Sequence, residues 1–158
     1  LGHGPAAATV ARQSVHLLEN TRTPDVSAIV RDCHAELRGS RGVVMSLAMF
    51  DGDRNTMEWL GVGNVYGTLW SPRTSQRHTL VLRSGLVGDV LPRLQVSVVS
   101  VSDGDTLVFT TDGVSADIDE RLLQDTSVHN IAERILTHRH TSHDDALALV
   151  ARFRGVKG

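Results

Sequence analysis

Three short strings, far apart in the chain, carry residue types that could hold a metal ion. They are Leu1-Gly2-His3-Gly4, Thr110-Thr111-Asp112-Gly113 and Asp144-Asp145-Ala146-Leu147. The first is a glycine-rich turn before a helix, whereas the other two place carboxylates directly after and directly before apolar strands. Carboxylates at the ends of paired strands can converge, and hard divalent cations such as Mg²⁺ or Mn²⁺ prefer oxygen ligands.

Each string also has a simpler structural interpretation when it is taken alone. The Gly2-His3-Gly4 turn would point backbone N–H groups and the positive end of a helix dipole at an anion, but glycine's permissive backbone explains such a turn equally well. Asp112-Gly113 is ordinary turn chemistry. Asp144 and Asp145 would point to opposite faces of a strand, so only one of them would face a given site. The occurrence of all three strings in this order is rarer, and it favours a metal site.

Length, composition and charge set the outer bounds. A chain of 158 residues with 41% hydrophobic and 22% charged residues is typical of one globular domain, here residues 1–158. The formal net charge of −2 provides no basic field for nucleic acid or an anionic membrane. The single cysteine, Cys33, cannot form an internal disulfide, which favours a reducing compartment such as the cytoplasm. No apolar run approaches the ~20 residues of a membrane span.

Hydrophobic periodicity and turn residues predict a mixed order of helices and strands. The predicted helices cover residues 5–20, 24–37, 118–123 and 128–136, and Thr23 is the expected N-cap of the second. The predicted strands cover residues 43–50, 56–62, 64–70, 79–82, 95–101, 106–110 and 146–153. Helices, then a strand meander, then helices and a closing strand indicate an α+β domain in which helices cover antiparallel sheets.

The three strings, in this order, resemble those of a known protein family. The glycine-rich turn before an alanine-rich helix, the Thr-Thr-Asp-Gly-Val string and the Asp-Asp-Ala-Leu string are similar to those of the metal-dependent, type-2C (PPM) serine/threonine protein phosphatases, in their SpoIIE-like and RsbX-like branch. Three intermediate stretches, residues 41–46, 60–65 and 84–88, are similar as well. The resemblance extends over nearly the whole chain, and the order and spacing of its short motifs make it specific.

The resemblance implies a fold, a cofactor and an activity. The fold would be an α-β-β-α four-layer sandwich of mainly antiparallel sheets, with two Mn²⁺ or Mg²⁺ ions at one edge. A metal-activated water would attack the phosphorus of a phosphoserine or phosphothreonine. By motif position Asp112 and Asp144 match metal ligands, and Asp145 matches a neighbouring position that tolerates Asp or Asn. The substrate would be a phosphorylated anti-sigma antagonist or a related stress-signalling protein.

The resemblance departs from the family pattern at its start. In the family an Asp-Gly pair precedes the glycine-rich turn, and its Asp bridges the two metals. Those residues would lie before Leu1, so we expect this chain to be an N-terminally truncated excerpt of a longer protein that binds metal weakly by itself. The opening strands would be missing too, and the exposed sheet edge would favour a homodimer.

Other candidate groups have structural explanations. His138, His140 and His143 lie close to Asp144, but their spacing matches no structural zinc pattern, and a solvated loop is the preferred interpretation. We expect Cys33 to be a small core residue. Ser46 and Ser115 show no triad arrangement. Trp59 and Trp70 are expected to be packing residues.

Two classes of function stay open from the sequence. The first is an active phosphoprotein phosphatase that resets a bacterial signalling switch. The second is a catalytically inactive module of the same fold that binds and regulates a signalling partner. An Asp two places before Leu1 in the parent protein would favour the first.

Overall fold

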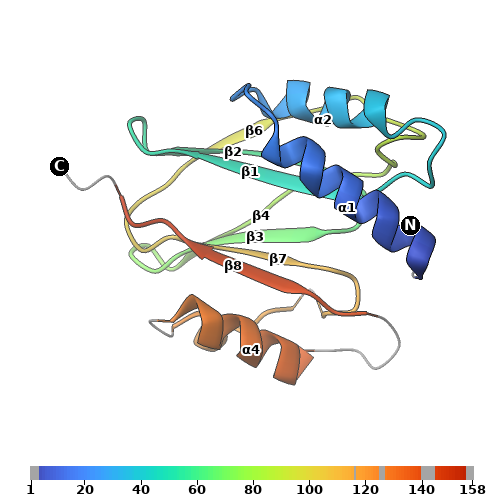
Figure 1. Cartoon of the computed structure of the whole chain (residues 1–158). Helices are drawn as coiled ribbons and strands as arrows, with labels where there is room; N and C mark the ends of the chain where they lie inside the picture. Colours follow the sequence, from blue (N-terminus) through green and yellow to red (C-terminus); the bar gives the residue numbers. More distant parts are fainter. Residues whose placement is uncertain (1–3, 116, 125–126, 140–144, 156–158) are drawn as a thin grey trace.

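The chain forms two β-sheets with helices on their outer faces, as the computed structural model in Figure 1 shows. The structure describes residues 4–115, 117–124, 127–139 and 145–155. In chain order the elements are α1 (Pro5–Glu19), α2 (Val26–Glu36), β1 (Met45–Asp51), β2 (Thr56–Val62), β3 (Tyr66–Ser71), β4 (Gln76–Thr79), β5 (Leu82–Arg83), β6 (Ser97–Ser100), β7 (Thr106–Thr110), α3 (Glu120–Leu123), α4 (Val128–Arg139) and β8 (Ala148–Arg152).

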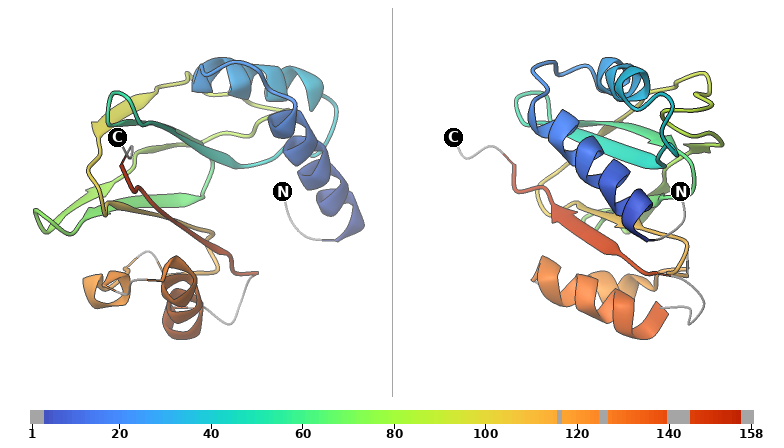
Figure 2. Two further views of the ribbon diagram at one scale, coloured as in Figure 1. Left: turned by 60° about the vertical axis from the view of Figure 1, so that its left-hand side comes forward. Right: turned by 45° about the vertical axis from the view of Figure 1, so that its right-hand side comes forward.

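The two sheets are mainly antiparallel. In the first sheet, β2 pairs with β1 on one side and with β5 and β6 on the other, and only the short β2–β5 pairing is parallel. In the second sheet the order is β4-β3-β7-β8, and all three pairings are antiparallel. The two views of Figure 2 show α1 and α2 on the outer face of the first sheet and α4 on the outer face of the second. The predicted α-β-β-α sandwich is therefore confirmed.

Strand β2 shows how the sequence builds two of the three apolar layers. Its side chains alternate between the two faces of the sheet. Met57 and Trp59 are fully buried and pack between the sheets, whereas Leu60 and Val62 pack toward α1 and α2. The second half of the strand is buried on both faces, and Trp59, Leu60 and Val62 are correspondingly apolar.

Strand β7 builds the third layer in the same way. All five of its residues are buried. Leu107 and Phe109 face the layer between the sheets, and Val108 faces α3 and α4. Since apolar burial contributes roughly 25 cal/mol per Å², the two-sided burial of β7 fixes the position of this strand and of the turn that follows it.

Two local predictions from the sequence were wrong. Helix α2 begins at Val26 with Asp25 as its N-cap, because the Asp25 carboxylate accepts hydrogen bonds from the N–H groups of Ser27 (2.8 Å) and Ala28 (3.1 Å). The sequence predicts one strand at residues 79–82, but these residues belong to two different strands and the link between them. Leu80 is buried between the sheets, so the chain leaves β4 in one sheet and enters β5 in the other.

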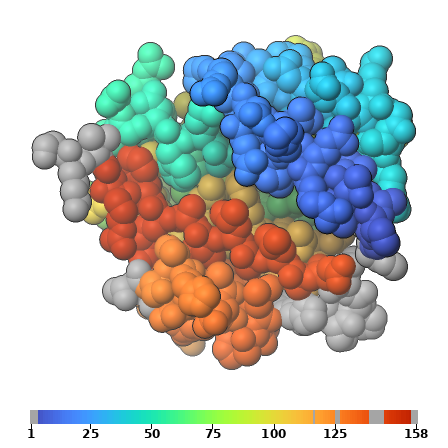
Figure 3. All heavy atoms as spheres, viewed as in Figure 1, coloured from blue at the N-terminus to red at the C-terminus, as the bar shows by residue number. Residues whose placement is uncertain are grey.

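Both sheets are open, so each has edge strands with a single neighbouring strand among the described residues, and β4 is one of them. Strands β1 and β8 each pair on one side only, and β8 crosses the face of the molecule seen in Figure 3. Six of the seven residues of β1 are partly exposed. Any open sheet has such edges, so both the missing opening strands and dimerisation through an exposed edge stay predictions. None of the described helices is long and apolar enough to span a membrane.

Candidate functional site

The candidate site begins where buried strand β7 ends. After Thr110 the chain turns through Thr111, Asp112 and Gly113, and the turn is closed by a hydrogen bond from the N–H of Val114 to the carbonyl of Thr111 (3.0 Å). Val114 and Gly113 are buried, whereas Asp112 is exposed. The burial on both sides of Asp112 therefore holds its carboxylate at a fixed point on the surface.

A residue in the connection between β2 and β3 contacts this carboxylate, and the β3–β7 register (Tyr66↔Thr110), continued by two residues, places it opposite Asp112. The Nδ2 group of Asn64, just after β2, donates a short hydrogen bond to Oδ2 of Asp112. The structure shows no partner for Oδ1 of Asp112 among the described residues. An amide that donates to one carboxylate oxygen orients the group and leaves the other oxygen available to a cation.

The segment that carries the second acidic string lies directly beside Asp112. The N–H of Thr111 donates to the carbonyl of Leu147 (3.1 Å), and the N–H of Leu147 donates to the hydroxyl of Thr111 (2.9 Å). The same hydroxyl donates to the carbonyl of Asp145 (3.3 Å). These contacts continue the β7–β8 pairing beyond Thr110↔Ala148. The backbone at Asp145 is thereby brought next to the turn of Asp112.

The first string has one described residue, Gly4. It is the N-cap of α1 with φ of 94°, a left-handed conformation that favours glycine. Pro5 follows it as the first helical residue, as predicted. The N-terminal end of α1, the end of β7 and the start of β8 lie at the same end of the sandwich in Figures 1 and 2.

Several predicted site residues lie outside the described residues. These are Gly2, His3 and Asp144, together with His140 and His143 of the histidine-rich stretch. The expected closeness of Asp112 and Asp144 is therefore untested. Within the described residues no group of three or more His, Cys, Asp or Glu side chains could hold a metal ion.

The described groups nevertheless fit a hard divalent cation in their chemistry. Asp112 supplies an exposed carboxylate, and Asp145, also exposed, supplies oxygen atoms close by. These are the ligand types that Mg²⁺ and Mn²⁺ prefer. The donor set among the described residues consists of oxygen ligands alone, so it favours such a cation over zinc.

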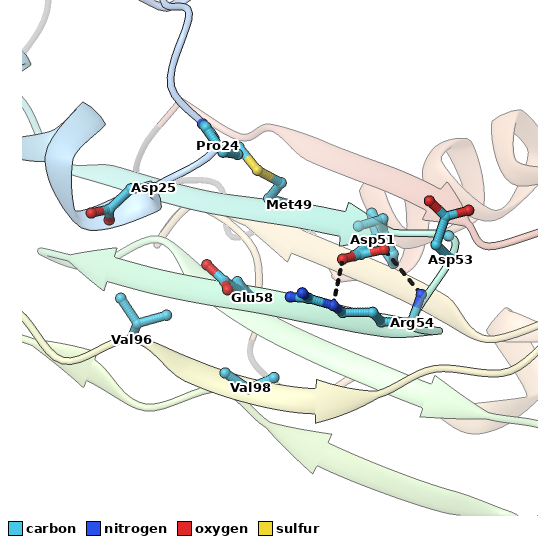
Figure 4. A pocket seen from close by; sticks show the side chains of 11 residues that line it. Pro24, Asp25, Met49, Asp51, Asp53, Arg54, Glu58, Val96 and Val98 are labelled. Carbon is cyan, nitrogen blue, oxygen red and sulfur yellow. Dashed lines mark hydrogen bonds and ion pairs between the residues drawn. The ribbon is translucent and has the colours of Figure 1, made fainter.

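A groove of about 890 Å³ lies elsewhere, over the outer face of the first sheet. Figure 4 shows its carboxylates, which include Asp25, Asp51 and Glu58. Asp51 accepts a hydrogen bond from the N–H of Arg54 (3.0 Å) and lies 3.7 Å from its guanidinium. The hydrogen bond from the Ser27 hydroxyl, and then that from the N–H of Ala28, lower the pKa of Asp25. Both carboxylates thus serve a local turn or helix cap.

The residues that the sequence predicts to be core residues, Trp59, Trp70 and Cys33, are buried in the structure. Trp59 is fully buried, and its Nε1 donates to the carbonyl of Val81 (3.3 Å). Trp70 is buried beneath α3 and α4. Cys33 is buried on α2, where desolvation raises the pKa of its thiol. A raised pKa disfavours the thiolate, so Cys33 is a poor nucleophile.

Sequence reasoning missed the role of Asn64. The string Leu60–Val65 was noted for its similarity to the family, but no function was assigned to the amide. Its position was the available signal for such a role. Asn64 follows a glycine after the end of buried strand β2, and Asp112 likewise follows the end of buried strand β7. Only the three-dimensional structure shows that the two strand ends meet.

Comparisons with known proteins agree with this geometry. The phosphoserine phosphatase RsbX of Bacillus subtilis (strain 168) is 25% identical over 146 residues, which are 92% of this chain and 73% of RsbX. A solved protein described with the bacterial stressosome, "a modular system that has been adapted to control secondary messenger signaling", is 27% identical with a TM-score of 0.88, over 96% of this chain and 80% of that one.

The crystal structure of RsbX in complex with magnesium has the same fold. Its TM-score is 0.82 at 24% identity, and the match covers 95% of this chain and 75% of that one. The family model for stage II sporulation protein E (SpoIIE) matches residues 1–154. The chain therefore belongs to the SpoIIE family.

Proposed function

We propose that the chain is a metal-dependent phosphoserine/phosphothreonine protein phosphatase of bacterial stress signalling. The observation that carries the proposal is the contact between Asn64 and Asp112 at the end of β7. It orients an exposed carboxylate at one edge of the sandwich, next to the backbone of Asp145. Membership of the SpoIIE family and the similarity to RsbX, a phosphoserine phosphatase, support the same activity.

The proposed metal ligands are Asp112 and Asp144, with Gly113 and Asp145 beside them. A bound Mn²⁺ or Mg²⁺ pair would supply an activated water and positive charge against the phosphate oxygens. The chain's own contribution is orientation. Asn64 holds Asp112, and the hydroxyl of Thr111 holds the backbone of the 145–147 segment. The turn of Gly2, His3 and Gly4 would lie on the phosphate side of the site.

The proposed substrate is a phosphorylated anti-sigma antagonist or a related stress-signalling protein. The stressosome-related structural neighbour supports a partner of this class. A cytoplasmic location follows from such a substrate, and the reduced, buried thiol of Cys33 is compatible with it. We further propose that residues 1–158 act as one phosphatase domain, since three apolar layers join both sheets to the helices that cover them.

Phosphatase assays test this proposal directly. The protein, expressed in its full natural length, should hydrolyse para-nitrophenyl phosphate and release phosphate from a phosphoserine protein in the presence of Mn²⁺. Chelation with EDTA should abolish both activities, and added Mn²⁺ should restore them. Absence of turnover on both substrates at saturating Mn²⁺ would favour the inactive binding module instead.

A further inference from the structure

A second hollow, of about 610 Å³, is lined by two arginines and contains no acidic side chain. Its lining residues are Arg83, Ser84, Pro92, Arg93, Leu94 and Gln95, and we call it the arginine hollow. Arg83 and Arg93 are both exposed. Guanidinium groups stay protonated at any physiological pH and carry five N–H donors in a planar fork. The hollow therefore presents two permanent positive charges to solvent.

The arginine hollow is held by specific contacts. Arg83 belongs to β5, which pairs with β2 through Val62↔Arg83. Pro92 lies against Gly85 so closely that a Cβ on that glycine would be 2.5 Å from Cδ of Pro92. A backbone hydrogen bond from Leu86 to Val90 (2.8 Å) closes the intervening loop. The segments that carry the two arginines are thus fixed against each other before any ligand binds.

The charges of the arginine hollow are not balanced within it. Arg83 donates a short hydrogen bond from Nη2 to the neutral Oε1 of Gln95, and that bond uses one of its five donors. Among the described residues Arg93 has no hydrogen bond or ion pair. The acid of the same loop, Asp89, does not line the hollow. Two cations that line one hollow, without an acidic side chain in its lining, favour binding of an anion.

The position of the hollow connects it to the candidate site. The N–H of Gly63 donates to the carbonyl of Arg83 (2.8 Å), and the next residue, Asn64, holds Asp112. The loop after β5 and the end of β7 lie at the same end of the sandwich in Figure 1. A polypeptide with its phosphoserine near Asp112 could therefore reach the arginine hollow with a neighbouring segment.

We propose that the arginine hollow docks an acidic segment of the phosphoprotein substrate, through carboxylates that bind Arg83 and Arg93. This inference rests on the proposed phosphatase function, and it names the feature of the substrate that the enzyme selects. Arginine is suited to this task because its fork matches the two oxygens of a carboxylate. The contacts are exposed, so they contribute specificity and association rate more than tight affinity.

Binding of a fluorescein-labelled, glutamate-rich peptide without phosphate tests the arginine hollow separately from catalysis. Fluorescence anisotropy in EDTA removes any contribution from metal. The double variant Arg83→Gln/Arg93→Gln should bind the peptide about tenfold more weakly than the wild type, as expected for two exposed charge contacts. The matched control, Arg54→Gln/Arg73→Gln, loses the same charge at exposed positions outside the hollow and should bind as the wild type does.

The outcomes separate the two proposals. Equal affinity of the wild type and the Arg83/Arg93 variant, or an equal loss in the Arg54/Arg73 control, would overturn the docking proposal, whatever the phosphatase activity. Loss of para-nitrophenyl phosphate turnover in the wild type would overturn the proposed function and leave the binding result standing. With both intact, the wild type should prefer a glutamate-flanked phosphoserine peptide over a neutral-flanked one, and the Arg83/Arg93 variant should lose that preference.

Discussion

Two of the three Asp-Gly pairs of the chain, Asp51-Gly52 at the end of β1 and Asp112-Gly113 just after β7, have different roles. At Asp51-Gly52 the carboxylate accepts the N–H of Arg54, three residues on, and lies near the guanidinium of the same residue. At Asp112-Gly113 the carboxylate accepts a hydrogen bond from Asn64, which is 48 positions away and lies just before β3, the strand that pairs with β7. The same dipeptide therefore closes a local hairpin in one place and makes a long-range contact at a candidate site in the other.

This difference separates turn chemistry from site chemistry. A carboxylate bonded within its own turn is explained by that turn. Asp112 follows a strand that is buried on both faces, and a distant residue binds its carboxylate. The whole fold therefore keeps that carboxylate at one position. The groove beside Asp51 is the more hollow region, yet its acids Asp25 and Asp51 already serve a helix cap and a hairpin. The size of a hollow alone would have pointed away from the candidate site at Asp112.

The largest expected effect is that of Asp112→Asn. Asparagine keeps the size of the side chain but removes the charge that holds a hard cation. We expect Mn²⁺-dependent phosphatase activity to fall by at least about 100-fold, beyond the usual cost of losing an outer contact. Asp51→Asn makes the same chemical change in the other Asp-Gly pair and should retain activity. Similar losses in both variants would remove the distinction between the two turns.

The next effect is that of Asn64→Ala, which removes the hydrogen bond to Asp112 and leaves the carboxylate in place. Groups that orient metal ligands typically contribute 10–100-fold to metal affinity or activity. We expect the Mn²⁺ concentration for half-maximal activity to rise about tenfold, with part of the maximal rate recovered at saturating metal. A variant with unchanged Mn²⁺ dependence would show that Asn64 has no positioning role.

A smaller effect is expected for Asp145→Asn. The contact with Thr111 uses the backbone carbonyl of Asp145, which asparagine retains. Activity should therefore change only a few-fold, far less than for Asp112→Asn. His140→Ala, in the histidine-rich stretch, should likewise have little effect on turnover. If either variant were inactive while Asp112→Asn stayed active at saturating Mn²⁺, the catalytic centre would have to be placed elsewhere.

The smallest effect is expected at Asp25, whose carboxylate has only a local role as the N-cap of α2. Asp25→Ala should lower the melting temperature by about 2–4 °C at neutral pH, and Thr23→Ala should lower it less. The pKa of Asp25 is lowered from 3.8 in the folded protein. The cap therefore stabilises the fold above that pH and loses its contribution as the pH falls through the lower, folded value. Thermal melts at neutral pH and well below the lowered pKa of Asp25 should show the difference between wild type and Asp25→Ala shrinking.

Much of this fold could be predicted because the periodic spacing of apolar residues in the sequence shows which segments form the buried layers. Strands β2 and β7 begin and end where the sequence predicted, since turn residues bound their apolar runs. The crossing from β4 to β5 could not be predicted, because Leu80 is buried by residues distant in the chain. The cap of α2 was misplaced because Thr23 and Asp25 are both good caps, and only geometry decides between them.

The candidate site was predictable in part. Asp112 could be selected because it follows an apolar strand. Its string also stands between the glycine-rich turn and the Asp-Asp-Ala-Leu string, in the order that the family shows. Asn64 could not, since nothing in the sequence says that β3, which begins just after Asn64, pairs with β7. The arginine hollow was missed for the same reason, because Arg83 and Arg93 are brought together by the packing of Pro92 on Gly85.

Anomalous diffraction from crystals soaked in Mn²⁺ tests the central claim most directly. The account predicts that the strongest manganese peak lies within about 2.0–2.6 Å of a carboxylate oxygen of Asp112, the range of oxygen ligands to divalent cations. That peak should be absent from crystals of Asp112→Asn. A strongest peak beside Asp51 and Asp53, or no peak near Asp112 at saturating Mn²⁺, would contradict the account.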